Sequence, residues 1–278
     1  MSQNLLIGET GPLPDNLSYD NEISQEENLN ANSRLWIQRD GTLFKEYVTY
    51  DNVTSENIDN LFLISSSEKL RKIPEISMPL AIYEEQGRIA GYLMEYHDMK
   101  SFAYYLNTRE HSVVLRAFQQ IAMVINKLPR GVYIGDLHAG NVLVNENDIR
   151  IIDVDGFSLK QGHEMTCPLK NFSDYSVFFK KKYRNKNGDF FVSRDSDIAC
   201  LLWLFLSYIM GTNPFNYTET ELKRYIAFLA DSGIPKGLSR MLTRMMSPRH
   251  NCLIPGAFSK INHELLDKCS YRNFVLGV

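Results

Sequence analysis

Residues 133–157 read YIGDLHAGNVLVNENDIRIIDVDGF, and this stretch predicts more about the fold than any other part of the chain. Asn141–Val144 predicts a strand, residues 145–148 predict a polar turn, and Ile149–Ile152 predicts the returning strand. Closing this hairpin brings Asn141 close to Asp153. An acid five residues before an Asn, followed by a second acid after an apolar strand, is the arrangement that holds magnesium on nucleotide phosphates and orients an attacking hydroxyl.

Asp136, Asn141 and Asp153 match this pattern, and here the chain resembles the protein-kinase-like superfamily. The resemblance implies that Asp136 accepts the proton of the substrate hydroxyl, and that Asn141 and Asp153 bind magnesium. Residues 153–157, Asp-Val-Asp-Gly-Phe, depart from the Asp-Phe-Gly of protein kinases. Asp155 is therefore a second candidate for the metal.

The catalytic loop also departs from the common protein-kinase form. Ile134-Gly135 stands where His-Arg usually precedes the catalytic Asp, and His138 stands where a Lys usually follows it. Gly-Asp-Leu-His is similar to the loop of aminoglycoside phosphotransferases and of some atypical bacterial kinases. By this resemblance His138 is a catalytic candidate that contacts the transferred phosphoryl group or orients the loop, and a packing or turn role is the alternative.

A second segment, residues 197–215, predicts a buried helix with apolar residues all round it. Ser196 or Asp197 suits the N-cap, and Gly211 with Pro214 ends the helix. The segment resembles the central helix of the helical lobe in protein kinases. Its thirteen nearly unbroken apolar residues, 198–210, are too few to span a membrane, which needs about 20.

Residues 34–38 and 42–48 flank Arg39-Asp40-Gly41 and predict a hairpin, with Lys45 in its second strand. The resemblance implies that Lys45 contacts the phosphates of ATP, and the alternative is a strand lysine that faces solvent. No Gly-x-Gly-x-x-Gly precedes this hairpin, and residues 28–33 are the nearest candidate for a phosphate-covering turn. A helix over residues 55–64 would present Glu56 or Asp59 as the acidic partner of Lys45.

A further hairpin is predicted by residues 80–85, the turn 86–87 and residues 88–96. Its end resembles the gatekeeper and hinge of kinases, so Met94, the backbone of Glu95 and His97, and Leu143 beneath the ring are ATP-binding candidates. The alternative is that Met94 and Tyr96 are only core residues of an edge strand. Helices are predicted over residues 99–106, 113–128, 218–230, 235–246 and 255–266.

These elements predict an α+β protein, and the resemblance implies a bilobal protein-kinase-like fold. A small antiparallel-sheet N-lobe would occupy residues 34–96 and a mainly helical C-lobe residues 97–278, after a polar acidic extension over residues 1–33. With 278 residues, 44% hydrophobic content and a net charge of -3, the chain has no bulk attraction to nucleic acid.

The cysteines and the N-terminus predict where the protein works. Cys167, Cys200, Cys252 and Cys269 show neither zinc-site nor disulfide-scaffold spacing, which indicates a reducing compartment. No secretory signal and no membrane span are visible. We therefore expect a cytoplasmic protein, or one delivered to the cytosol of a host.

The segment before residue 197 contains a basic run, Lys180 to Lys186, with Lys170 upstream. The run could dock an acidic or phosphorylated protein, a phosphorylated residue of its own loop, or RNA, and a solvated loop is the alternative. The own-loop candidates are Ser173, Tyr175 and Ser176.

The functional expectation is a MgATP-dependent phosphotransferase, an atypical serine/threonine protein kinase of bacterial type with a protein substrate. The alternatives are a pseudokinase-like scaffold that binds nucleotide or protein, a small-molecule phosphotransferase, and an AMP transferase on the same fold.

Overall fold

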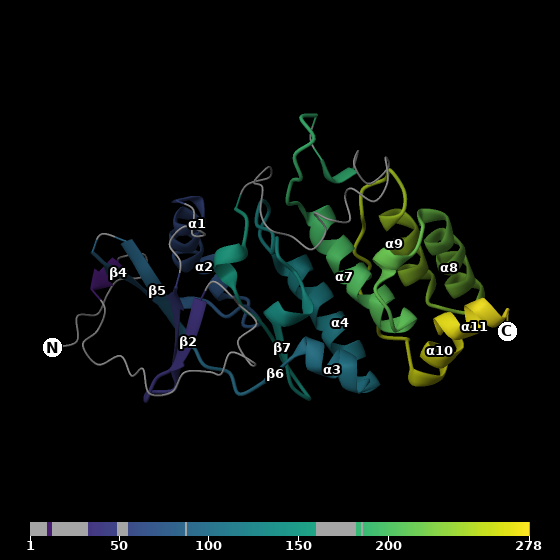
Figure 1. Cartoon of the computed structure of the whole chain (residues 1–278), viewed down its shortest axis with the longest axis horizontal. Coiled ribbons are helices and arrows are strands. Elements are labelled where there is room, and N and C mark those ends of the chain that lie inside the picture. The colour runs from purple at the N-terminus through teal and green to yellow at the C-terminus, as the bar shows by residue number, and fades with distance from the viewer. Residues whose placement is uncertain are drawn as a thin grey trace.

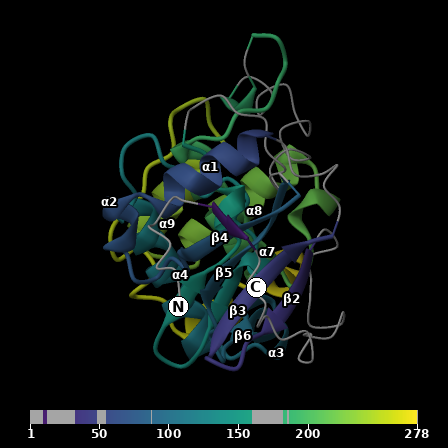
Figure 2. The ribbon, with the colours of Figure 1, turned by 90° about the vertical axis from the view of Figure 1, so that its left-hand side faces the viewer.

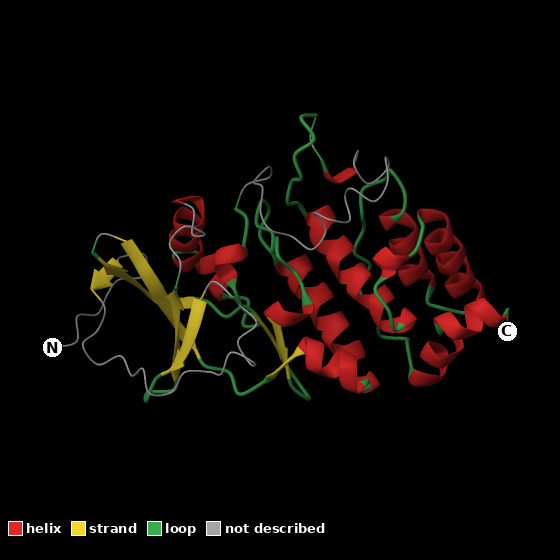
Figure 3. Cartoon of the chain, viewed as in Figure 1, coloured by secondary structure: helices red, strands yellow, loops and turns green. Residues whose placement is uncertain are grey.

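The computed structural model describes residues 10–12, 33–48, 55–86, 88–159, 182–184 and 186–277, and for residues 10–12 and 55–59 the backbone alone. Within these ranges the protein is mixed α and β, with a large sheet of five strands, a small sheet of three strands and several helices. The large sheet lies at one end of the molecule and the long helices lie at the other (Figure 1, Figure 3). This segregation agrees with the predicted α+β class.

The large sheet has five strands in the order β1-β4-β5-β3-β2. Their bounds are Thr10–Pro12 for β1, Ser33–Ile37 for β2, Thr42–Tyr47 for β3, Pro79–Glu85 for β4 and Arg88–Glu95 for β5. Both predicted hairpins are confirmed, and Figure 2 views the sheet with β2 and β3 side by side. The parallel strand β1 was not predicted, because it lies within the stretch taken as an extension.

A smaller sheet of three strands, in the order β6-β7-β8, lies between the large sheet and the helices. The strands are Lys100–Ser101, Val142–Val144 and Ile149–Ile151. The predicted β7–β8 hairpin is confirmed, and the Asn145 side chain closes its turn by accepting from the N–H groups of Asn147 and Asp148 at 2.9 and 2.8 Å. Asn141 itself ends a short 3-10 helix, η2 (Ala139–Asn141), before the strand begins.

The helices reproduce most of the predicted segments. Next to the large sheet lie α1 (Ser55–Ser65) and α2 (Glu68–Arg71). The helical end is built from α3 (Phe102–Thr108), α4 (His111–Lys127), α7 (Arg194–Met210), α8 (Glu219–Asp231), α9 (Lys236–Met245), α10 (His263–Lys268) and α11 (Tyr271–Leu276). Short 3-10 turns, η3 (Val154–Gly156) and η4 (Pro214–Asn216), follow β8 and α7.

Helix α7 is the centre of the core. It packs against α4, where the Phe118 and Phe205 rings meet with centroids 5.4 Å apart. Its C-terminus ends at Gly211 as predicted, with the left-handed φ of 67° that glycine tolerates. The predicted N-cap at Ser196 or Asp197 is wrong, because the capping box is made by Ser193 with Ser196, which places Asp197 inside the helix.

The helix predicted over residues 255–266 is also wrong. Residues 255–260 form turns, and α10 begins only after Asn262, whose side chain accepts from the Leu265 N–H at 2.9 Å. Local capping by Asn262 therefore overrides the helical spacing of the apolar residues before it. Of the cysteines, Cys200 and Cys269 are buried, Cys252 is half-buried, and Cys167 lies outside the described residues. Among the described helices, none has the length and apolar character that crossing a membrane requires.

Candidate functional site

Lys45 projects from the middle of β3 and is only 3% exposed, so the alternative of a strand lysine facing solvent is wrong. Its strand is clamped between β2 and β5. Gly91 on β5 makes this close approach possible, because a Cβ on that residue would lie 2.1 Å from the Lys45 carbonyl oxygen. The backbone of Lys45 is therefore fixed by the neighbouring strands β2 and β5.

The Lys45 ammonium lies between two carboxylates that come from a distant part of the chain. It forms an ion pair with Asp153, and it donates to both oxygens of Asp155 at 3.0 and 3.1 Å. Burial alone would lower the pKa of Lys45, but the two carboxylates outweigh burial and raise the pKa above its usual range. Lys45 therefore stays protonated in this site.

The two carboxylates differ in how fully the protein satisfies them. Asp155 is buried and also accepts from the Tyr47 hydroxyl at 2.8 Å and the Tyr92 hydroxyl at 3.1 Å. Burial opposes its charge, yet the charge of Lys45 and the hydrogen bonds with Lys45, Asp153 and Tyr47 lower the pKa of Asp155. Asp153 is more open, with its side chain 21% exposed, and within the described residues it accepts only from Lys45. Burial raises the pKa of Asp153 to about 6.

Asp153 has a left-handed backbone, with φ 65° and ψ 45°, at the point where β8 ends and η3 begins. For a residue other than glycine this conformation costs about 1–2 kcal/mol. Backbone strain of this kind concentrates at functional sites. The neighbouring Ile152 N–H donates to the Asn141 carbonyl at 3.0 Å, so the end of the hairpin holds Asn141 and Asp153 next to each other, as the sequence predicted.

Asp136 and Asn141 face each other across the loop. The Asn141 amide nitrogen donates to the Asp136 carbonyl at 3.1 Å and to its carboxylate at 3.5 Å, and among the described residues the Asn141 amide oxygen remains an open acceptor. Burial raises the pKa of Asp136 to about 6, against the hydrogen bond from Asn141. Gly156 packs behind Asp136, since a Cβ there would lie 3.6 Å from the Asp136 Cβ. The loop and the residues after the hairpin therefore meet at one place.

The loop before Asp136 is anchored by helix α7. The Asp197 carboxylate accepts from the backbone N–H groups of Ile134 at 2.9 Å and of Gly135 at 3.0 Å. Asp197 is 1% exposed, and burial raises its pKa to about 7 despite these two hydrogen bonds. The residue expected to cap a helix thus holds the loop before Asp136 instead.

His138 has the turn role that was the alternative, and its catalytic role stays a prediction. Its Nδ1 accepts from the Gly140 N–H at 3.0 Å, which is a turn role, and its Nε2 lies 3.7 Å from the Asp136 carboxylate. Burial lowers the pKa of His138 and favours the neutral ring. Because Nδ1 accepts, the single proton of that ring lies on Nε2 and faces Asp136.

The residues predicted for adenine binding lie at the junction of the two sheets. Met94 is a buried residue of β5 opposite Leu43, and Glu95 pairs with the start of β3. The His97 ring lies 3.3 Å from the Ser77 hydroxyl, and its carbonyl accepts from the Met99 N–H. Leu143 is half-buried in β7. Met94 is therefore a core residue, although of a central strand and not of an edge strand. Its contact with a ligand stays a prediction.

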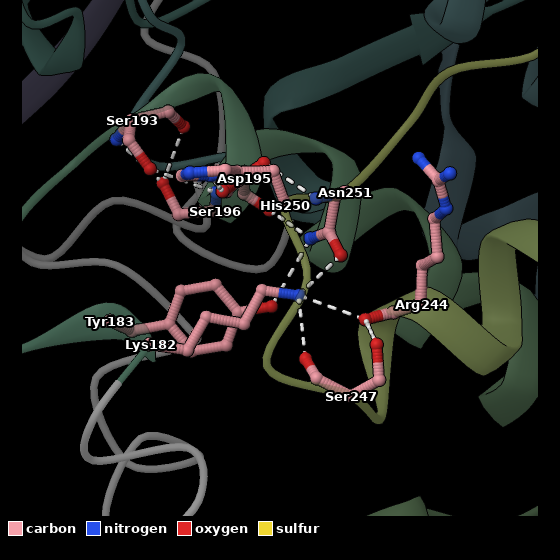
Figure 4. Close-up of polar contacts among 9 residues, drawn as sticks. All are labelled: Lys182, Tyr183, Ser193, Asp195, Ser196, Arg244, Ser247, His250 and Asn251. Carbon is pink, nitrogen blue, oxygen red and sulfur yellow. Dashed lines mark hydrogen bonds and ion pairs between the residues drawn. The ribbon is translucent and has the colours of Figure 1, made fainter.

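The basic run is only partly described, since Lys180, Lys181 and Asn185 lie outside the described residues. Lys182 does not project toward a partner. Figure 4 shows its ammonium among oxygens at the C-terminus of α9, where it donates to the Arg244 carbonyl at 3.0 Å and to the Asn251 side chain at 2.6 Å. Burial lowers the pKa of Lys182 to about 8. The Lys182 ammonium is therefore bonded within the protein instead of being solvated, and docking by the run stays a prediction.

Sequence reasoning missed three features of the site: Tyr47, Tyr92 and the anchoring role of Asp197. The two tyrosines could have been found. Tyr47 is two residues from Lys45 on one strand, so both side chains share a face, and Tyr92 lies directly opposite Lys45 in the β3–β5 pairing. The predicted partners Glu56 and Asp59 have side chains outside the described part of the chain.

No protein-family model matches the chain, and no curated protein matches it. In the described residues, no three His, Cys, Asp or Glu side chains form a metal-binding group. Magnesium is usually held by one or two carboxylates together with substrate phosphates. The Asn141 amide oxygen and the open carboxylate of Asp153 are hard oxygen ligands that fit it.

Proposed function

We propose that this protein is a MgATP-dependent phosphotransferase with a bilobal protein-kinase-like fold, and that it acts as an atypical serine/threonine protein kinase. One observation carries the proposal. A buried lysine on a sheet, Lys45, meets Asp153 at the end of a hairpin, and the start of the same hairpin carries Asn141 beside Asp136. Phosphoryl transfer needs this combination of a fixed cation, oxygen ligands and a hydroxyl-orienting acid.

Each residue then has a separate task. Asn141 and Asp153 would hold magnesium, which when bound neutralises charge on the phosphates of ATP. Lys45 would contact the phosphates as the fixed cation of the site. Its raised pKa keeps it cationic at neutral pH.

Asp136 orients the acceptor hydroxyl and takes its proton. With a pKa of about 6, it is mostly ionised at neutral pH, yet more basic than an exposed carboxylate. The Nε2–H of His138 faces Asp136 and restricts its orientation. Met94, the backbone of Glu95 and His97, and Leu143 would surround adenine.

The proposed acceptor is a protein. The support is the length of the match to kinases in α7 and in Gly211-Thr-Asn-Pro-Phe215, an ending that small-molecule phosphotransferases do not usually carry. The Gly-Asp-Leu-His loop is the feature that favours a small-molecule acceptor. A cytosolic location, in the cell of origin or in a host, would supply ATP and magnesium.

A pseudokinase-like scaffold is the second candidate, and one observation favours it. The single charge of Lys45 is shared between Asp153 and Asp155, and the Asp155 carboxylate is fully bonded within the protein. Contacts of this kind within the protein suit a scaffold. A scaffold, however, has no chemical need for Asp136 beside Asn141.

Intact-protein mass spectrometry after incubation with MgATP tests these candidates, with a generic protein acceptor present. A gain of one phosphate on the protein or on the acceptor supports the kinase. A gain of AMP supports the nucleotide transferase. If neither mass changes while ATP still raises the melting temperature, the scaffold is supported.

A further inference from the structure

The carboxylate of Asp155 has the most complete set of partners in the candidate site. Its Oδ1 accepts from Lys45 at 3.0 Å and from Tyr92 at 3.1 Å. Its Oδ2 accepts from Lys45 at 3.1 Å and from Tyr47 at 2.8 Å. A carboxylate has about four lone-pair positions, so these donors use all of them. Asp155 therefore has no position left for a metal ion.

The sheet alone positions the three donors, since Lys45 and Tyr47 lie on β3 and Tyr92 lies on β5. Lys45 and Tyr47 alternate on β3 and point to the same face. Tyr92 stands opposite Lys45 in the β3–β5 pairing, and the Lys45 ammonium lies 5.7 and 5.6 Å from the Tyr47 and Tyr92 ring centroids. Both tyrosines are buried. The donors thus form a rigid row on one face of the sheet.

Asp155 reaches this row from the turn η3, where it is itself buried. Its neighbour Val154 is 0% exposed and fixes the turn in the core, and η3 packs against α1. Asp153, by contrast, accepts from Lys45 through one oxygen and is more open to solvent. The geometry separates the two acids that the sequence could not distinguish.

We propose that Asp155 is the positioning residue that holds Lys45 in place for the phosphates, and that Tyr47 and Tyr92 hold Asp155. The metal role then belongs to Asp153 and not to Asp155. The acid that positions the lysine is then Asp155, which follows the β7–β8 hairpin. The sequence had instead suggested an acid on α1, Glu56 or Asp59. The role of Lys45 toward phosphates rests on the proposed function. The hydrogen bonds of Asp155 do not depend on it.

The test compares Asp155→Asn with Asp153→Asn in steady-state phosphoryl transfer and in the magnesium concentration that gives half-maximal rate. We expect Asp155→Asn to lower kcat by about 10- to 100-fold with an unchanged magnesium requirement, as expected for loss of a positioning contact. Asp153→Asn should instead raise the magnesium requirement. If Asp155→Asn raises the magnesium requirement as much as Asp153→Asn does, Asp155 is a metal ligand and the inference is overturned.

A double-mutant cycle with Lys45→Met asks whether Asp155 acts through Lys45. If it does, Asp155→Asn should have almost no further effect in the Lys45→Met background. If the fold-losses in kcat of the two single variants multiply in the double variant, Asp155 acts independently of Lys45, which contradicts the inference.

Tyr47→Phe with Tyr92→Phe keeps the aromatic packing and removes only the hydroxyls. This pair should lower kcat in the same sense but less, and an unchanged kcat would show that the tyrosines do not hold Asp155.

Acylation of Lys45 by an amine-reactive reagent, read by peptide mass spectrometry, gives a result that does not need phosphoryl transfer. Asp155→Asn, or the tyrosine pair if the first variant does not fold, should change the rate several-fold relative to the wild type. An unchanged rate overturns the inference. If the wild type shows no transfer while Lys45 labelling still depends on Asp155, the proposed function fails and the positioning contact stands.

Discussion

The Asp197 carboxylate accepts a hydrogen bond of 3.0 Å from the backbone N–H of Gly135, and this contact joins the core helix α7 to the loop that carries Asp136. A second bond, from Ile134, completes the anchor. The loop therefore depends on a buried acid that has no place in the proposed chemistry. This dependence can be measured separately from activity.

Replacing Asp197 by Ala should destabilise the protein and also lower phosphoryl transfer. Two buried N–H groups would lose their acceptor, at a cost of about 1–3 kcal/mol for each unsatisfied group. Urea unfolding of Asp197→Ala measures this loss of free energy of unfolding. Asp231→Ala, at the exposed end of α8, is the control and should change the free energy by no more than about 0.5 kcal/mol. Equal stability of the two variants would contradict the anchoring role.

Asp197 should also make stability depend on pH. Burial raises the pKa of its carboxyl from 3.8 to about 7, so between these values the folded protein binds more protons than the unfolded chain. The contribution of Asp197 is then fully present below pH 4 and is lost as the pH rises toward 7. The free energy of unfolding of the wild type, relative to Asp197→Asn, should fall across this window. A difference that is constant from pH 4 to 7 would rule out the raised pKa.

Gly91→Ala should displace the strand that carries Lys45. The added Cβ would lie 2.1 Å from the Lys45 carbonyl oxygen, closer than any real contact, so β3 and β5 must separate. We expect a loss of about 1–3 kcal/mol in the free energy of unfolding, as for other overpacked sites. Gly41→Asn is the matched control, because nothing lies within 4 Å of its Cβ and Asn tolerates the left-handed backbone found there. Thermal unfolding of the two variants should give a clearly lower Tm for Gly91→Ala alone.

Lys182→Met tests whether part of the basic run is structural. The substitution removes a cation from the C-terminus of α9 and leaves the Asn251 side-chain oxygen without its Lys182 donor, while the Arg244 carbonyl still accepts from the N–H and the hydroxyl of Ser247. Destabilisation of about 1–3 kcal/mol is expected. Lys186→Met, at an exposed position of the same run, should be close to neutral. A neutral Lys182→Met would leave docking as the better explanation of the run.

Local patterns in the sequence were enough for the three hairpins and most helices, but not for β1 or for β6, which falls in residues predicted as a helix. The β7–β8 hairpin could be predicted because apolar residues flank Asn145, whose side chain makes the turn by itself. Lys45 could be placed on a strand for the same reason. The α10 boundary could not, since capping by Asn262 competes with an apolar pattern that begins earlier.

Long-range contacts explain what the sequence could not decide. Nothing in the sequence distinguishes Asp153 from Asp155. Their surroundings differ because Asp153 has a left-handed backbone and Asp155 meets the row of donors on the sheet. The surroundings of Lys182 depend on residues about 60 positions away. Such contacts become visible only when the whole chain is folded.

Phosphate incorporation from γ-labelled MgATP into a protein acceptor, by the wild type and by Asp136→Ala side by side, tests the central claim most directly. The wild type should transfer phosphate only when magnesium is present. Asp136→Ala should lose about 10²–10⁴-fold of the rate, as expected for a missing general base, while still binding MgATP. Absence of transfer by the wild type, or an undiminished rate in Asp136→Ala, would contradict the proposed phosphotransferase.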